Sequence, residues 1–138
     1  MSQVQYIGSG VVAGSIVGTG QTIDGKTVPA TGVKNIITAS LGTVPGVYLL
    51  KVDVAGFDSA TPGGVAYFVT GAARTTGAAS VEIIPEACDE FEENPPTYGL
   101  CDVHIKCDGA LNNVLIEVTG TLGKTIDWIA VLTYTFGS

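Results

Sequence analysis

Three cysteines and the only histidine are the residues of this chain with the widest range of possible chemistry. Cys88, Cys101, His104 and Cys107 together have the ligand types of a structural zinc site. If residues 101 to 107 form a strand, however, its ends lie roughly 20 Å apart at about 3.3 Å per residue, and His104 points away from both cysteines. One tetrahedral ion cannot reach this set, so we predict no metal site unless the segment is a loop.

The alternation of a strand places Cys101, Val103, Ile105 and Cys107 on one face. Inward cysteines are usually small buried apolar residues, and that is our first interpretation. The alternative is a disulfide from Cys88 to Cys101 or Cys107, which would staple the loop between them and stabilise the fold by about 3 kcal/mol. Such a bond requires an oxidising setting, which a particle meets after release from a cell.

Nucleophilic catalysis would need a base, and His104 is the sole histidine. A cysteine and a histidine on opposite faces of one strand cannot share a proton, and no G-x-S-x-G motif occurs, so we predict no enzymatic activity. The run from Gly8 to Ala13 matches G-x-G-x-x-A, the dinucleotide fingerprint. The glycines at 14, 18 and 20 that follow cannot propagate a helix, so no cofactor is expected.

The composition points to a component of an assembly. The 138 residues suit one domain, and charged residues make up only 14%, against about 25% in an average domain. With a mean hydropathy of +0.41, too few charges exist to coat a free monomer, so we expect a homo-oligomer with apolar surface covered by other subunits. A net charge of −7 and six scattered basic residues exclude nucleic acid as a partner. The uncharged first 23 residues are interrupted by glycines and polar residues, so neither a signal peptide nor a membrane span is expected.

Short runs of period-two alternation, separated by Gly, Pro and Asp-Gly turns, recur along the chain and predict an all-β fold. We expect an antiparallel β-sandwich of the jelly-roll type, with a closed barrel as the alternative. Residues 114–120 and 124–136 are predicted to pair as a hairpin. The expected strands are Val4–Ile7, Val11–Val17, Val33–Leu41, Val47–Gly56, Val65–Thr70, Ser80–Ile84, Cys101–Cys107, Val114–Thr119 and Thr125–Phe136.

Residues 1–30 are rich in glycine, serine and threonine and form either an extended arm or edge strands, while residues 31–138 form the sandwich domain. As an arm, the segment would contact partners through Val11, Val12, Ile16 and Val17. Residues 86–99 concentrate five acids and two prolines, and we interpret residues 86–94 as an acidic, solvated loop.

Two structural motifs carry a resemblance to a known class of domain. Val118-Thr-Gly120, a short turn and then Lys124-Thr-Ile-Asp-Trp128-Ile-Ala130 resemble the ending of β-sandwich domains in tailed-bacteriophage virion proteins. The strand from Val47 to Gly56 is similar to the V-x-V-x-G strand of such domains. The resemblance covers about residues 33 to 136, with Trp128 as the expected core anchor, and the acidic segment and the N-terminal 30 residues depart from it.

The resemblance implies a non-enzymatic virion component. We expect a capsid decoration (cement) protein that binds the major capsid protein and sister subunits, as a trimer that matches capsid symmetry. It would be assembled in the host cytoplasm and then carried on the virion. The alternative is a tail-fibre or baseplate module that binds a host receptor or glycan through exposed aromatics, for which Tyr67, Phe68, Phe91 and Tyr98 are candidates. A self-assembling cellular protein is a third interpretation.

Overall fold

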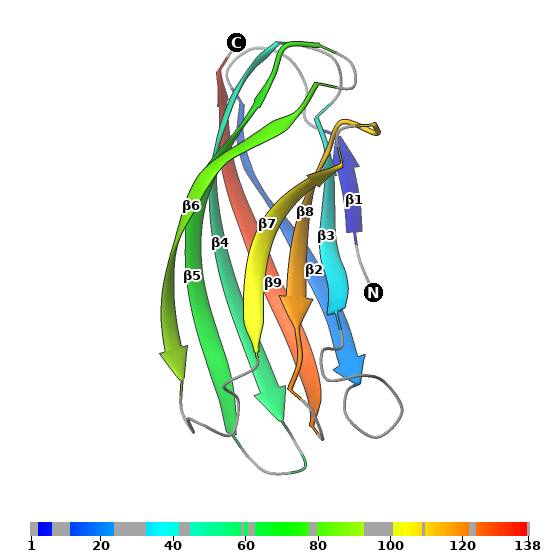
Figure 1. Cartoon of the computed structure of the whole chain (residues 1–138), viewed down its shortest axis with the longest axis vertical. Helices are drawn as coiled ribbons and strands as arrows, with labels where there is room; N and C mark the ends of the chain where they lie inside the picture. The colour runs from blue at the N-terminus through cyan, green and yellow to red at the C-terminus, as the bar shows by residue number, and fades with distance from the viewer. Residues whose placement is uncertain are drawn as a thin grey trace.

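A computed structural model of the chain shows long β-strands arranged in two facing layers (Figure 1). It describes residues 3–6, 12–23, 33–41, 45–58, 60, 63–77, 80–92, 101–108, 110–121 and 124–137. Within these ranges no helix is long and apolar enough to cross a membrane. The strands are β1 (Gln3–Tyr6), β2 (Val12–Ile23), β3 (Val33–Ser40), β4 (Gly46–Asp58), β5 (Gly63–Thr75), β6 (Glu82–Glu92), β7 (Asp102–Asp108), β8 (Asn113–Thr119) and β9 (Thr125–Gly137).

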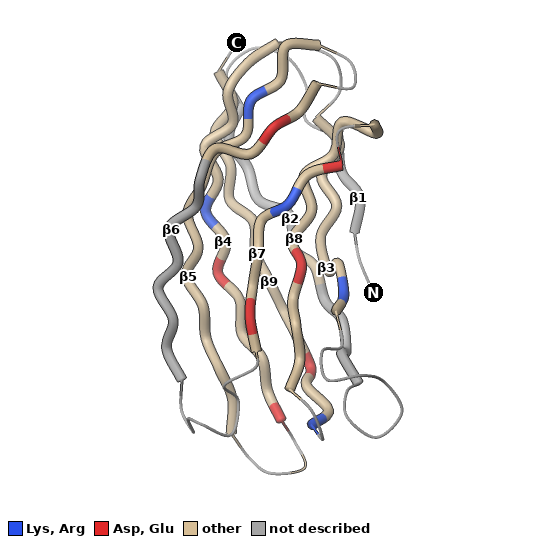
Figure 2. Tube along the Cα trace, in the orientation of Figure 1, with Lys and Arg blue, Asp and Glu red and all other residues tan. Residues whose placement is uncertain are grey.

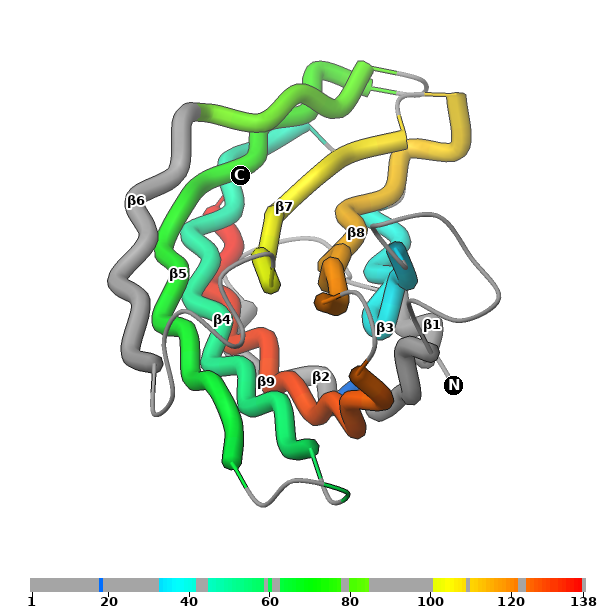
Figure 3. The backbone as a smooth tube through the Cα atoms, turned by 60° about the horizontal axis from the view of Figure 1, so that its bottom comes forward, coloured from blue at the N-terminus to red at the C-terminus, as the bar shows by residue number. Residues whose placement is uncertain are grey.

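The strands form two sheets, which confirms the predicted β-sandwich. Sheet A has the order β1-β3-β8-β7, and sheet B has the order β2-β9-β4-β5-β6. All pairs are antiparallel except β1 with β3, which is parallel. Seen towards one end, sheet B curves around sheet A, and the core lies between them (Figure 3). The jelly-roll subtype stays a prediction.

Hydrophobic alternation sets which face of each strand is buried. In β9 every second residue from Ile126 to Phe136 is buried, and the residues between them are exposed or half-buried. β4 shows the same period from Tyr48 to Val54, and β8 from Val114 to Val118. This is the pattern of a sheet with one face against a core, as the sequence predicts.

The predicted hairpin between residues 114–120 and 124–136 is wrong. β8 lies in sheet A between β3 and β7, whereas β9 lies in sheet B between β2 and β4. The turn between them, in which Lys124 N donates to Thr121 O at 3.0 Å, therefore carries the chain from one layer to the other. Both strands bury one face, so their alternation fits a crossing between layers as well as it fits a hairpin.

The two motifs that resemble virion β-sandwich domains meet in the core. Gly56 of β4 pairs directly with Trp128 of β9, and Trp128 is only 2% exposed. A Cβ atom added at Gly56 would lie 2.7 Å from Cζ3 of the Trp128 ring. On the other side of β9, Gly20 of β2 is the partner of Trp128. The glycine in V-x-V-x-G thus leaves the space that the tryptophan ring needs.

The acidic segment differs from the prediction of a solvated loop. β6 continues to Glu92, so residues 86–92 are part of a strand, and the backbone of residues 87–92 pairs with β5 from Val65 to Thr70. The register shifts between Thr70 and Ala72, where Pro85 and Glu86 together oppose Gly71. Proline cannot donate to a ladder, and an edge strand with a bulge is where it is tolerated. Residues 93–94, the end of the predicted loop, lie outside the described residues.

The N-terminal residues pair along two sheet edges. β1 adds to sheet A beside β3, and β2 runs antiparallel to β9 over its whole length in sheet B. Gly14, Gly18 and Gly20 of β2 pair with Tyr134, Ala130 and Trp128, the inward residues of β9. The glycine spacing of this segment therefore follows the period of a strand's inner face.

Asn112, in the connection between β7 and β8, forms hydrogen bonds with the segment after β3 and with the segment before β6. It has a φ of 56°, in the left-handed region, and it is 5% exposed. Its Oδ1 accepts hydrogen bonds from Ser80 N at 3.1 Å and Val81 N at 3.0 Å, and its carbonyl accepts one from Leu41 N at 3.0 Å.

The substitution Asn112→Ala is expected to lower the free energy of unfolding by about 2 kcal/mol, because it leaves two backbone N–H groups without their acceptor and strains a left-handed backbone. Urea denaturation at one protein concentration measures this. Asn112→Gly tolerates the same φ but lacks the acceptor, so it should lose somewhat less than Asn112→Ala and still be clearly destabilised. A loss near zero for Asn112→Gly would contradict the hydrogen-bonding role.

Tyr48 supplies a pH-dependent contribution to stability. Its ring stacks on Phe136 with centroids 4.3 Å apart, and its hydroxyl donates to Leu41 O at 3.1 Å in the core. Burial raises the pKa of the Tyr48 phenol above its usual value of about 10. The folded state therefore holds this proton more tightly than the unfolded state, so the stabilisation is complete below about pH 10 and is lost as the pH rises further.

We expect Tyr48→Phe to be less stable than the native chain by about 1 kcal/mol at pH 7, through loss of the hydrogen bond. The difference between the two proteins should shrink above about pH 10, because the variant has no phenol to ionise at this site. Urea titrations at pH 7 and at pH steps above 10 measure both effects. A difference that stays constant with pH would contradict the assignment.

Candidate interaction surface

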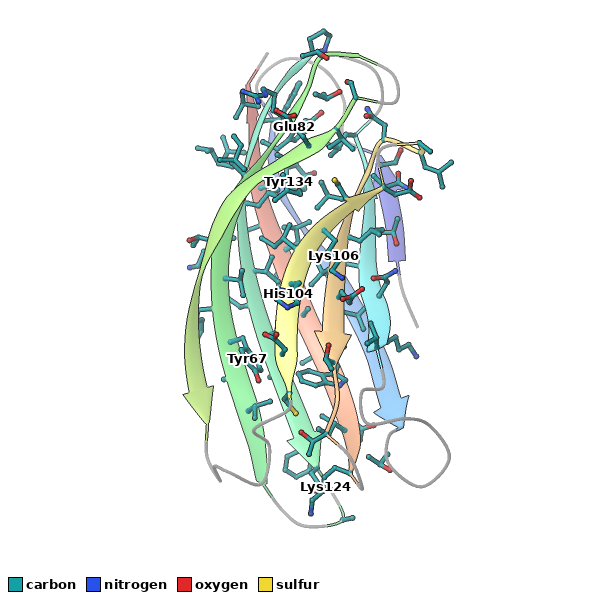
Figure 4. All side chains as sticks on the ribbon, viewed as in Figure 1. Tyr67, Glu82, His104, Lys106, Lys124 and Tyr134 are labelled. Carbon is teal, nitrogen blue, oxygen red and sulfur yellow. The ribbon has the colours of Figure 1, made fainter. Side chains whose placement is uncertain are left out.

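The outer face of sheet A carries charged groups that pair with one another. His104 and Lys106 lie on β7 (Figure 4). His104 Nε2 lies 2.8 Å from Asp102 Oδ2, and Lys106 Nζ lies 2.8 Å from Glu117 Oε1 of β8. The hydrogen bond and the charge of Glu117 raise the pKa of the Lys106 ammonium. Paired charged side chains of this kind are typical of a sheet face that is in contact with water.

The outer face of sheet B carries exposed apolar side chains on both sides of a charged pair, Lys51 and Asp53, at the middle of β4. Large hydrophobic side chains stand in solvent there: Leu49 is 60% exposed, Phe57 52%, Phe68 50% and Ile129 48%. They come from β4, β5 and β9, which are adjacent in the sheet. We call the outward residues of these strands the sheet B outer face. Several exposed apolar side chains on one face of a domain mark an interaction site.

A shallow hollow lies at the centre of this face. Its volume is about 220 Å³, and its walls are mainly apolar, with Ala55 and Ala66 between Phe68, Ile129 and Val131. Ala55 pairs with Ala66 on β5 and with Ile129 on β9, so small residues stand beside bulky ones. The hollow is therefore shaped to receive an apolar side chain from outside.

Asp53 is the acidic group at the hollow. Its Oδ1 is buried and has no hydrogen-bond partner among the residues that the structure describes. A carboxylate oxygen in this state favours a hydrogen-bond donor or a cation. Lys51 is two residues away on the same strand and is exposed. Figure 2 shows the basic and acidic residues scattered along the described strands.

The residues predicted to contact partners lie on β2, apart from Val11, which is outside the described residues. Val12, Ile16 and Val17 pair with Phe136, Leu132 and Val131 of β9. Their backbone is thus committed to sheet B. Their contact with a partner stays a prediction.

The cysteines are separated by the fold. Cys101 is buried, with its Sγ 3.1 Å from Thr121 Oγ1. Cys107, predicted to face inward, is instead exposed: Val103 and Ile105 of β7 are buried, but the alternation breaks at the end of this edge strand, where Lys106 and Cys107 are both exposed. The side chain of Cys88 lies outside the described part, so the disulfide between Cys88 and Cys101 stays a prediction. Within the described ranges, no group of three or more His, Cys, Asp or Glu residues could hold a metal ion.

Sequence reasoning missed the sheet B outer face. Of the aromatic residues proposed for receptor binding, Tyr67 is buried and Phe68 is exposed. Tyr98 and the side chain of Phe91 lie outside the part of the chain that the structure describes. The sequence of β4 does carry a signal for this face. Its outward positions include the apolar residues Val47, Leu49 and Phe57, which face solvent.

No family model matches the sequence, and no curated protein matches it. Among solved structures, the crystal structure of the Acinetobacter baumannii phage AM24 tailspike protein is similar, with a TM-score of 0.48 and 12% sequence identity. The match covers 91% of this chain and 26% of that chain, so this chain spans about a quarter of the tailspike. A likeness of this degree assigns neither an activity nor a partner.

Proposed function

We propose that this chain is a non-enzymatic structural protein of a tailed-phage virion, and specifically a capsid decoration (cement) protein that binds the outer shell and stabilises it. The observation that carries the proposal is the sheet B outer face, where Leu49, Phe57, Phe68 and Ile129 stand in solvent. A subunit that buries such a face adds apolar contact area to the particle. Because it binds only the assembled shell, it shifts the equilibrium towards the intact particle.

The resemblance of two motifs to virion β-sandwich domains supports the same proposal. The glycine of one motif, Gly56, makes room for Trp128 of the other. The partners would be the major capsid protein and sister subunits, and the chain would be assembled in the host cytoplasm and carried on the virion. A net charge of −7 disfavours nucleic acid as a partner.

A tail-fibre or baseplate module that binds a host receptor or glycan is the second candidate. The observation that favours it is the exposed ring of Phe68, which lines the hollow together with the carboxylate of Asp53, whereas the exposed ring of Phe57 lies outside the hollow. Aromatic faces and a hydrogen-bond acceptor are a set that sugars recognise. Binding to a glycan array that is lost in Phe68→Ala and kept in Phe57→Ala would support this candidate.

Quantitative mass spectrometry of gradient-purified virions, scored as copies of this chain per copy of the major capsid protein, tests the proposal. On the order of hundreds of copies per particle are expected for a subunit that repeats over a symmetric shell. A handful of copies would move the chain to the tail. Its absence from purified virions would overturn both virion functions.

A further inference from the structure

The outward residues of β4 form a pattern that is complementary to its own reverse, because each basic position then meets an acidic one. β4 is the middle strand of sheet B. Read along the strand, its outward residues are apolar, apolar, basic, acidic, apolar and apolar: Val47, Leu49, Lys51, Asp53, Ala55 and Phe57. The midpoint of this pattern is Val52. A surface of this kind is complementary to itself when one copy is turned end to end on another.

We propose that the sheet B outer face binds the same face of a second copy of this chain, around a two-fold axis that passes Val52 and runs across the strands. The β4 strands of the two copies then lie face to face and antiparallel. This proposal rests on the proposed function, because both use the sheet B outer face for assembly. It names a second copy of the chain as the partner of that face. It makes a dimer in place of the trimer that capsid symmetry suggests.

The charges at the centre of the face select this arrangement. About an axis at Val52, Lys51 of each copy faces Asp53 of the other, which makes two symmetric ion pairs. Lysine is long enough to span most of the roughly 10 Å between packed sheets. The ammonium would pair with the half-buried carboxylate of Asp53, whose Oδ1 has no hydrogen-bond partner among the described residues. An axis along the strands would instead place Lys51 on Lys51 and Asp53 on Asp53, which is unfavourable.

The apolar residues of β4 fit the same axis. Leu49 of the second copy lies over Ala55, which with Ala66 forms the hollow of about 220 Å³. Phe57 lies over Val47 of the second copy, so two exposed hydrophobic side chains cover each other. A protruding leucine thus meets small alanines on both sides of the axis.

The strands on either side of β4 add contacts at the centre of the interface through uncharged residues. On β5, which pairs with β4, Phe68 is level with Asp53 and Thr70 with Lys51. The axis therefore sets Phe68 of one copy over Thr70 of the other. On β9, Val131 and Thr133 hold the equivalent positions. The ring of Phe68, half exposed in the single chain, becomes covered.

The size of the contact sets the expected affinity. Because sheet B is curved, contact concentrates on β9, β4 and β5 (Figure 3). From Val47 to Phe57 a strand spans about 33 Å, and three strands span about 14 Å, so the footprint is roughly 450 Å² per copy. That is below the approximately 800 Å² of a standard interface, so we expect a reversible dimer with a Kd on the order of micromolar.

Sedimentation equilibrium of the purified full chain, from about 1 to 500 µM, tests the proposal. The native chain should fit a monomer–dimer equilibrium. Lys51→Asp and Asp53→Lys should each raise Kd by about 100-fold or more, because like charges then face each other twice. An equimolar mixture of these two variants should form a heterodimer, and the double variant carrying both changes should dimerise by itself.

The mixture and the double variant control for misfolding. If they form dimers, the substituted chains are folded, and the weaker association of each single variant comes from its charge. Lys106→Asp makes the same charge change on the outer face of sheet A and should leave Kd unchanged. A native chain that is monomeric at 500 µM, or trimeric, overturns the proposal, as does a mixture that stays monomeric. A monomer found at high copy number on virions would overturn the dimer and leave the proposed function standing.

Discussion

Replacing Trp128 with alanine is expected to lower the free energy of unfolding by about 3–5 kcal/mol. Trp128 is buried near the start of β9, and its ring lies near that of Tyr67, with centroids 6.5 Å apart. Its partners on the two neighbouring strands are Gly56 and Gly20. Neither glycine has a side chain that can move into the space left by the ring. We therefore expect the upper part of this range.

Urea denaturation at a fixed protein concentration measures the effect of Trp128→Ala, with Thr125→Ala as the matched control. Thr125 begins the same strand and is exposed, so its truncation should change stability by less than about 0.5 kcal/mol. A loss below about 1.5 kcal/mol for Trp128→Ala would contradict its role as the core anchor.

Gly18→Val is expected to destabilise the fold by about 3 kcal/mol or more. Gly18 is a buried residue of β2, and β3 of sheet A lies against it. A Cβ atom at Gly18 would meet the carbonyl oxygen of Ile36 at a distance that backbone atoms cannot tolerate. Ile36 is the extra residue of a β-bulge, which buries both Ile36 and Ile37 and brings this carbonyl towards β2. Any side chain at Gly18 must push the two sheets apart.

The matched control is Gly137→Val. An added Cβ at Gly137 meets no atom within 4 Å, so the same change should alter stability by less than about 0.5 kcal/mol. Thermal unfolding of the two variants separates the steric effect from the general effect of replacing glycine in a strand. Similar losses in both would contradict the close approach of Gly18 and Ile36.

Much of the fold could be predicted because alternation reports burial directly. The inward residues of β9, Trp128 among them, follow the pattern that the sequence shows. Alternation does not report which strand lies alongside. For this reason residues 114–120 and 124–136 gave the right strands and the wrong pairing. The glycines of β2 could be interpreted only once their partners on β9 were known.

The candidate surface was harder to predict than the core. A strand that is apolar on both faces, as in Tyr48, Leu49 and Leu50, reads as one continuous hydrophobic run. Such a run does not say which residues face solvent until the sheet is known. Cys107 shows a second limit: its position in the alternation of β7 predicts that it faces inward, but the alternation breaks after Ile105, at the end of the strand.

The position of β9 between β2 and β4 also determines when the fold can form. β2 finds its partner more than 100 residues later in the chain, since Val12 pairs with Phe136. During synthesis, β4 and β5 can close as a hairpin, whereas β2 has no neighbour in its sheet until residues 125–137 have been made. Pairing across such sequence separations is slow, in the millisecond to second range for small β-proteins. Until then the edges of β2 and β4 are open to other chains, so a nascent chain halted before Thr125 should be prone to aggregation.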